Sequence, residues 1–100
     1  MKTFCIVYGA GPNWAPGKSV REQDLGDHLR FMDRLFRQGT LIAAGPFGDE
    51  GGMAIVECDD HSQATALVQQ DPGVIAGKLV PQIHQWWVLF DKGRGISPFG

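Results

Sequence analysis

Apolar and polar positions along this chain follow two periods, and the change from one to the other divides it into segments. Short apolar runs rich in β-branched and aromatic residues are typical of strands, whereas apolar residues that recur every three or four positions predict helices. These patterns predict strands at 3–8, 40–45, 53–58 and within 78–90, and helices over 24–38 and 60–71. The Gly- and Pro-rich stretch at 9–23 is predicted to be a long loop, and loops of this length often carry function.

Local signals mark the ends of both predicted helices. Asp24 can accept hydrogen bonds from the free first-turn amides as an N-cap, and Gly39 suits the C′ position. Asp60 is expected to cap the second helix, with Gln63 three residues later as in a capping box. Pro72 disfavours helical geometry at the residue before it, so the second helix should end there and a turn should follow.

The order of these elements is β-α-β-β-α-β. It predicts an α+β, ferredoxin-like split β-α-β fold, in which an antiparallel four-stranded sheet carries two helices on one face. A chain of 100 residues is expected to form one domain. We assign 1–90 to that domain and 91–100 to a polar, glycine-containing C-terminal tail.

The predicted strands are apolar on both faces. An antiparallel sheet with one face in water should alternate apolar and polar residues. Instead, the third strand keeps Ile55 next to Val56, and the fourth has Trp86 next to Trp87, so one ring should point to each face. Because two helices can cover only one face, we expect a homodimer joined through the sheet faces, as in a dimeric α+β barrel.

The composition bears on partners and location rather than on the fold. Nine basic and eleven acidic residues nearly cancel, which argues against binding to nucleic acid or to an anionic membrane surface. No apolar run approaches the roughly 20 residues of a membrane span. Cys5 and Cys58 stand far apart in predicted strands, which favours reduced thiols and a cytoplasmic location.

His28 is the residue that the helical pattern does not explain. At roughly 100° per residue, it lies within the apolar arc of the first helix, between Met32 and Leu35. It is either a core histidine that is hydrogen-bonded to a neighbour or a proton-transfer group, because imidazole titrates near neutrality. A proton-transfer histidine needs an orienting or charge-balancing partner.

Asp71 is a candidate for that partner. It follows the C-terminal end of the second predicted helix, where the macrodipole disfavours a carboxylate by roughly 0.3–1 kcal/mol and an imidazolium would compensate. Asp71-Pro72-Gly73 is also good turn chemistry, with the carboxylate accepting from the backbone. Both interpretations stand, because a turn can present a carboxylate.

The other chemistry-bearing residues give weaker signals. His84 shares a face of the fourth strand with Trp86, so it should line a pocket or lie at the dimer interface. No spacing of His, Cys or carboxylate residues indicates a metal site, and the stretch at 9–11 lacks the third glycine of a dinucleotide-binding loop. We therefore expect neither a metal nor a cofactor.

Two segments carry a family resemblance, HLRFMDRLFRQGTLIAAGPFGDEGG and QATALVQQDPGVIAGKL. In residues and spacing, they resemble the YCII-related family of small dimeric α+β barrel proteins, over roughly residues 3–90. The loop PNWAPGKSVREQ resembles a subgroup with an insertion before the first helix. The marks of the resemblance are His28, Gly39, the Gly45-Pro46 step, Asp71-Pro72, Gly77 and an aromatic residue near the end of the last strand.

The resemblance implies a ferredoxin-like fold that dimerises through its sheets, and a His–Asp site formed here by His28 and Asp71. A relative in this family eliminates chloride from a chlorinated hydroxyquinol, and a muconolactone isomerase shares the barrel. This chain departs from the family in having Gly73 where a bulky residue often follows Asp-Pro. The departure predicts more room or flexibility beside Asp71.

Two classes of function remain open. In the first, a cofactor-free enzyme uses His28 to shuttle a proton and Asp71 to orient or charge it, in an elimination or isomerisation of a small cyclic or aromatic acid. In the second, the same pocket binds a small metabolite without catalysis. A cofactor-free monooxygenase is a third option that no residue supports.

Lys18 or Arg21 would hold an anionic group of the ligand, against an apolar and aromatic wall. The expected substrate-binding residues are Trp14, Lys18, Arg21, Pro46, Phe47 and His84.

Overall fold

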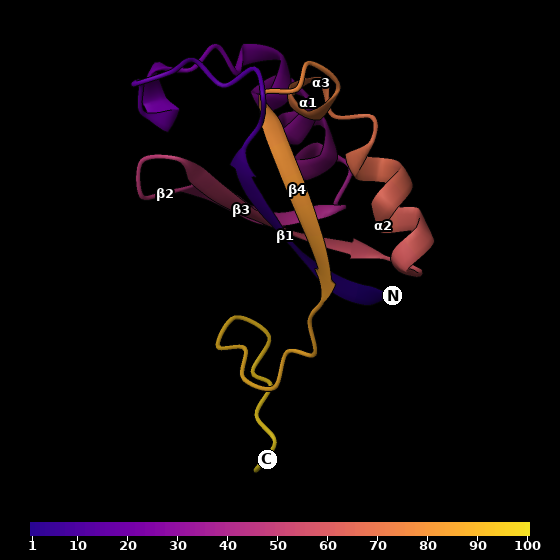
Figure 1. The fold of residues 1–100 in the computed structure, drawn as a ribbon. Helices are drawn as coiled ribbons and strands as arrows, with labels where there is room; N and C mark the ends of the chain where they lie inside the picture. The colour runs from indigo at the N-terminus through magenta and orange to yellow at the C-terminus, as the bar shows by residue number, and fades with distance from the viewer.

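The computed structural model describes residues 1–100 and shows one sheet with its helices gathered on one side (Figure 1). The strands are β1 (Lys2–Ala10), β2 (Leu41–Phe47), β3 (Gly51–Cys58) and β4 (Leu79–Gln85). The helices are the short 3₁₀ helix η1 (Val20–Glu22), α1 (Gly26–Arg37), α2 (His61–Val68) and the single-turn α3 (Pro72–Ile75).

The four strands form one antiparallel sheet in the order β2-β3-β1-β4. This order is that of the ferredoxin-like split β-α-β fold, so the predicted α+β fold class is confirmed. β1 lies inside the sheet, where Cys5 pairs with Ile55 of β3 on one side and with His84 of β4 on the other. This register decides which side chains share a face of the sheet.

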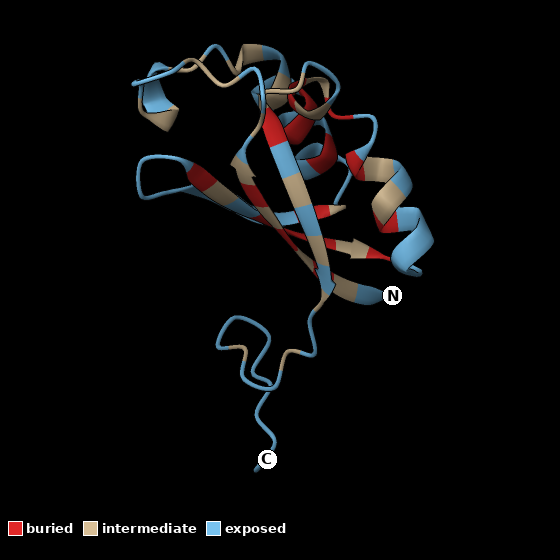
Figure 2. Ribbon diagram, in the orientation of Figure 1, coloured by how far each residue is buried: buried red, intermediate tan, exposed pale blue.

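Alternate residues of β1 point toward the helices and form the centre of the core. Phe4, Ile6 and Tyr8 are buried, whereas the residues between them are only partly buried. α1 supplies Phe31 and Leu35 from the other side of the core. Figure 2 shows the buried residues concentrated where the helices pack on the sheet. The main cluster of buried apolar side chains therefore lies on the helical side.

The opposite face of the sheet carries apolar side chains that no helix covers. By register, this open face holds Cys5 and Val7 of β1 together with Met53 and Ile55 of β3. Val80 of β4 lies on the same face, and Met53 and Val80 are 40% and 47% exposed. The two-sided apolar pattern is therefore present in the fold, and the homodimer that it led us to expect stays a prediction.

Two of the predicted helix caps are confirmed. Gly39 follows the last residue of α1 and its C-cap with a φ of 82°, a left-handed conformation that favours glycine. The Asp60 side chain accepts a hydrogen bond from the Gln63 amide at 2.8 Å. These signals depend only on residues close in sequence, so the pattern alone suffices to place them.

The predicted cap of the first helix is wrong. α1 begins at Gly26, its N-cap residue is Leu25, and Leu25 forms no side-chain cap bond. Asp24 instead presents its backbone carbonyl to the Lys78 ammonium group, which donates to it at 2.7 Å. A contact between the loop and the start of β4 thus decides the course of the chain before α1.

The second helix is shorter than predicted, and a separate turn of helix follows it. α2 ends at Val68, and Asp71 is the N-cap of α3, with Pro72 in the first helical position. Proline suits that position because its missing N–H has no helical partner there. The stretch that we expected to be a plain turn is therefore a short helix with a capped start.

β4 is shorter than the apolar run that predicted it, whereas β2 and β3 are longer and form a hairpin with a tight turn. β4 ends at Gln85, so Trp86 and Trp87 lie beyond it, although the Trp86 amide still donates to the Thr3 carbonyl at 2.8 Å. Residues 86–100, called the arm from here on, extend away from the sheet toward the C-terminus (Figure 1). None of the helices combines the length and the apolar content that crossing a membrane requires.

Candidate functional site

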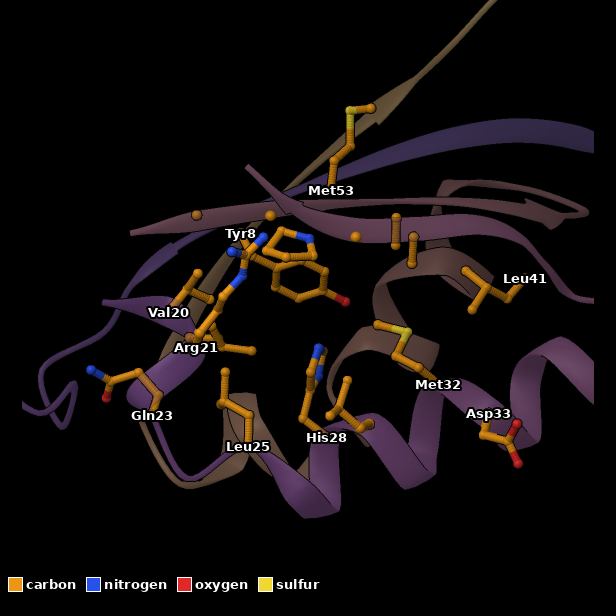
Figure 3. A pocket seen from close by; sticks show the side chains of 18 of the residues that line it. Tyr8, Val20, Arg21, Gln23, Leu25, His28, Met32, Asp33, Leu41 and Met53 are labelled. Atoms are coloured by element: carbon orange, nitrogen blue, oxygen red, sulfur yellow. The ribbon is translucent and has the colours of Figure 1, made fainter. Parts of the chain in front are cut away.

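A cavity of about 810 Å³ lies between α1 and the half of the sheet formed by β2 and β3. Tyr8, Arg21 and His28 come from three different elements and point into this space (Figure 3). On the helix side, the wall is apolar. Its members are Leu25, Leu29, Met32 and Phe36.

The sheet side of the cavity is built from small residues. Its members are Ala43, Ala44, Gly45, Pro46, Gly51, Gly52 and Ala54. At Gly52, an added Cβ would lie 3.1 Å from the Gly45 carbonyl oxygen, so the close approach of β2 and β3 favours glycine there. Apart from Leu41 and Met53, the residues of β2 and β3 that line the cavity carry little side-chain volume, which leaves room between these strands and α1.

His28 and Asp71 form the polar centre beside this cavity. The His28 Nδ1 atom lies 2.7 Å from the Asp71 Oδ2 atom. The His28 side chain is 13% exposed, and the Asp71 side chain is fully buried. The second carboxylate oxygen, Oδ1, accepts a hydrogen bond from the Gly73 amide at 2.9 Å. Both carboxylate oxygens are therefore engaged, as a buried polar group requires.

The pair is brought together by contact between α1 and α3. His28 lies in the first turn of α1, and Asp71 precedes α3, where it caps the helix. At Gly73, an added Cβ would lie 3.1 Å from the His28 Cβ atom and 3.0 Å from the Leu79 Cδ1 atom. The prediction of spare room at Gly73 is therefore wrong, because the missing side chain is what allows α3 to approach α1.

Tyr8 is a site residue that the sequence reasoning missed. Its ring contacts the His28 ring edge to face, with centroids 5.4 Å apart and an interplanar angle of 76°. Burial raises the pKa of Tyr8, and the nearby charge of Asp71 raises it further, so the phenol stays protonated at neutral pH. The sequence does indicate that Tyr8 faces the helices, because it continues the alternation of Phe4 and Ile6. It is also the only tyrosine in the chain.

Arg21 is held over the cavity by a loop with its own internal hydrogen bonds. The Gln23 side chain accepts from the Ala15 amide at 2.7 Å and donates to the Ala15 and Lys18 carbonyls at 3.1 and 3.2 Å. The Val20 amide donates to the Asp49 carbonyl at 2.7 Å, which ties η1 to the β2–β3 turn. Arg21 forms no ion pair, so its guanidinium can meet an anion.

The structure places the sequence-predicted site residues in three locations. Arg21 and Pro46 line the cavity with His28, and Asp71 lies directly behind His28. Trp14 and Lys18 lie in the loop outside the cavity, where the Trp14 indole N–H donates to the Lys18 carbonyl at 3.2 Å.

The last two predicted residues lie on the other side of the sheet. Phe47 contacts the backbone of Gly51 from the open face, and His84 is opposite Cys5 on that face. No group of three His, Cys, Asp or Glu side chains is arranged to hold a metal ion.

Comparison with known proteins places this chain among relatives of similar size. Over 70 residues it is 32% identical to the uncharacterized protein YjpA of Bacillus subtilis, covering 69% of this chain and 82% of YjpA. Its fold is similar to that of a 5-chloro-2-hydroxyhydroquinone dehydrochlorinase from Burkholderia phenoliruptrix, solved with 2,5-dihydroxybenzoquinone. The TM-score is 0.63 at 20% identity, over 84% of this chain and 93% of the enzyme. The YCII-related domain matches residues 1–86, and this chain therefore belongs to the YCII-related family.

Proposed function

We propose that this protein is a cofactor-free enzyme that moves a proton with His28 and Asp71, in an elimination or isomerisation of a small cyclic or aromatic acid. The observation that carries the proposal is the 2.7 Å contact between His28 Nδ1 and the fully buried Asp71 carboxylate, at the wall of a cavity. A carboxylate can only accept a hydrogen bond, so it holds the proton of the neutral imidazole on Nδ1. Nε2 is then left with a free lone pair, which is what a general base needs.

The proton transfer balances without any other reactant. Nε2 takes a proton from the substrate, and the electron pair of the broken bond either expels a leaving group or shifts to a neighbouring carbon. In an isomerisation, the same nitrogen returns the proton at a new position. Asp71 stabilises the imidazolium that forms in between, as the carboxylate does in Ser-His-Asp triads. The protonated phenol of Tyr8 lies beside the His28 ring as a potential hydrogen-bond donor.

The cavity walls support a flat, anionic substrate. The apolar face of α1 opposes a sheet wall of glycine and alanine, a shape that suits a ring. Arg21 supplies a cation with no partner of its own, and guanidinium groups bind carboxylates in a bidentate fashion. The similar fold of the dehydrochlorinase, whose named substrate is a chlorinated hydroxyhydroquinone, is consistent with a ring of this kind.

The alternative is a binding module that holds the same class of ligand without turning it over. Two features of the cavity favour this alternative. Its lining is largely apolar, and His28 supplies the only imidazole in its wall. A binding module would still need Arg21 and the shape of the cavity. It would not need the orientation of His28 that Asp71 imposes.

One experiment separates these functions. A panel of lactones and chlorinated hydroxyquinols is assayed for turnover, and 2,5-dihydroxybenzoquinone is titrated by calorimetry as a binding probe. We expect turnover by the wild type, its loss in His28→Gln, and a raised KM in Arg21→Gln. Lys18→Gln is the matched control, because Lys18 lies on the same loop but outside the cavity. Turnover that survives His28→Gln would refute the role of His28 as the base, and binding without turnover in the wild type would establish the alternative.

We also propose that the protein is a homodimer joined through the open face of the sheet. That face carries Val7, Met53 and Val80 with no helix over them, Met53 and Val80 are exposed, and exposed apolar patches mark interaction sites. Sedimentation at micromolar concentration should show a dimer, and a stable folded monomer would refute it.

A cytoplasmic location completes the proposal. Cys5 and Cys58 are both free, and reduced thiols persist in the cytoplasm. Fractionation of cells that express the tagged protein should find it there, and recovery from an oxidising compartment would contradict the assignment.

A further inference from the structure

The open face of the sheet has a hollow at one end. Its volume is about 550 Å³, and it lies where β1 ends, β4 begins and β2 turns into β3. Val7, Phe47 and Val80 supply its apolar lining, with Phe47 50% and Val80 47% exposed. Asp49 and Glu50 lie at its rim and form no ion pair within the chain. The hollow is thus apolar inside and acidic at its edge.

The arm begins at the opposite end of the same face. His84 is opposite Cys5, and the Trp86 amide donates to the Thr3 carbonyl, so the alternation of β4 continues to Trp86. Trp86 therefore points to the open face, and Trp87 points to the other. The ring of Trp86 is 46% exposed.

The arm has a defined shape on the open-face side. Asp91 and Ile96 exchange backbone hydrogen bonds of 2.8 and 2.9 Å, which closes a small loop. Arg94 reaches back to Glu57, with 3.5 Å between the charged atoms, and Glu57 belongs to the open face through its pairing with Thr3. Apolar side chains before, within and beyond this loop stay uncovered. They are Leu89 and Phe90 before it, Ile96 in it and Phe99 beyond it.

We propose that Trp86 of one copy seats in the hollow of a second copy, and that Lys92 of the arm faces the acidic rim there. This inference rests on the proposed sheet-to-sheet dimer and specifies its geometry. A two-fold axis that runs across the strands places the arm end of one sheet over the hollow end of the other. The contact then occurs twice, and the dimer closes on itself.

Charge and area both fit a second copy as the occupant. Lys92 forms no ion pair in its own chain, which matches the unpaired carboxylates of Asp49 and Glu50. A buried tryptophan covers about 150–250 Å² and Trp86 is 46% exposed, so the two exchanged rings add about 140–230 Å² to the area of the stacked faces. This adds to the apolar area of the stacked faces toward the roughly 1,200–2,000 Å² that a stable interface buries.

The contact also bears on the cavity. Phe47 lines the hollow, and its neighbour Pro46 lines the cavity on the other side of the same hairpin. The Asp49 carbonyl in that turn holds η1, which carries Arg21. A tryptophan from the partner would therefore brace the wall of the cavity from behind.

Analytical ultracentrifugation of the full chain and its variants tests the proposal. Trp86→Ala should raise the dimer Kd by at least about 30-fold, as expected for a central aromatic anchor. Trp87→Ala is the matched control, because its ring points to the other face, and its Kd should change by no more than about threefold. Circular dichroism should show the same fold in both variants, because both rings are exposed.

A charge exchange keeps the test decisive if Trp86→Ala unfolds. Lys92→Glu and Glu50→Lys should each weaken the dimer, and the double variant should restore it. A dimer with an unchanged Kd in Trp86→Ala, or no recovery in the double variant, would refute this contact and leave the sheet-to-sheet dimer standing. A monomeric wild type, or an arm that binds phosphatidylcholine vesicles instead of a second copy, would overturn the contact and the dimer together.

Discussion

Replacing Asp71 by Asn should reverse the tautomer of His28 while leaving the fold in place. In the wild type, Oδ2 can only accept, so the proton of the neutral ring lies on Nδ1, 2.7 Å away. In Asp71→Asn, the side-chain oxygen is needed by the Gly73 amide, which donates to Oδ1 at 2.9 Å. The NH₂ group must then point at Nδ1, which has to become the acceptor. The ring proton moves to Nε2, where it blocks the lone pair that acts as the base.

The expected changes in turnover and stability of Asp71→Asn follow from the hydrogen bonds that this variant keeps. Turning the amide the other way would set its NH₂ against the Gly73 N–H, at a cost of about 1–3 kcal/mol for each of the two unsatisfied donors. The tautomer is therefore fixed by the structure. The same substitution in Ser-His-Asp triads lowers kcat by about 10⁴-fold, so we expect a loss of about 10³–10⁴-fold here. Because both hydrogen bonds survive in number, the free energy of unfolding should change by less than about 1 kcal/mol.

Nitrogen-15 NMR of the His28 ring reads the tautomer directly, independent of any substrate. Asp33→Asn is the control, because Asp33 borders the same cavity but is exposed and pairs only with Arg37 at 2.8 Å. Such an exposed pair contributes less than about 1 kcal/mol, and its loss should leave both turnover and tautomer unchanged. A wild-type ring protonated on Nε2, or full turnover in Asp71→Asn, would show that the reasoning is wrong.

Three further predictions concern stability and thiol chemistry. The pKa of Tyr8 is raised above its ordinary value of 10.0, so the folded state holds this proton more tightly than the unfolded chain. The contribution of Tyr8 to stability should be constant below pH 10.0 and should be lost as the pH rises beyond it. The tyrosinate absorbance of this single tyrosine should appear only with unfolding, and Tyr8→Phe should remove this part of the pH dependence. Gly73→Ala should cost about 1–3 kcal/mol in denaturant unfolding through overpacking, and an unchanged midpoint would contradict the close approach of α3 to α1. Burial raises the pKa of the Cys5 and Cys58 thiols, so a thiol reagent should find two groups per denatured chain but react more slowly with the native protein.

The parts of the fold that the sequence predicts are those decided by neighbouring residues. The Asp60 cap and the left-handed Gly39 depend on a few adjacent positions, and the alternation in β1 depends on the pleat. The end of β4 depends instead on its partner strand. Trp86 still bonds to Thr3, and only Lys2 of β1 remains opposite the apolar residues that follow. An apolar run alone therefore overestimates the length of an edge strand.

The loop before α1 shows the same limit. Gln23 holds it by bonds that span five and eight residues, and Asp24 bonds to Lys78, 54 residues away. Such contacts have no periodic signature, so the sequence predicts a loop but not the position of Arg21. Tyr8 was missed for a related reason, because a buried aromatic residue in a strand has the same pattern whether or not a histidine lies against it.

His28 and Asp71 stand between these two cases. The sequence marks each of them separately, one as an imidazole on an apolar helical face and one as a carboxylate in an Asp-Pro-Gly turn. What joins them is the contact of α1 with α3, which Gly73 permits by having no side chain where His28 packs. A fully buried carboxylate with a single neutral donor would be costly, because burying an unpaired charge costs several kcal/mol. The His28 ring supplies the second partner, and the same contact that stabilises Asp71 fixes the ring with Nε2 free. The turn interpretation and the proton-transfer interpretation therefore describe one arrangement, in which Oδ1 caps α3 and Oδ2 orients the base.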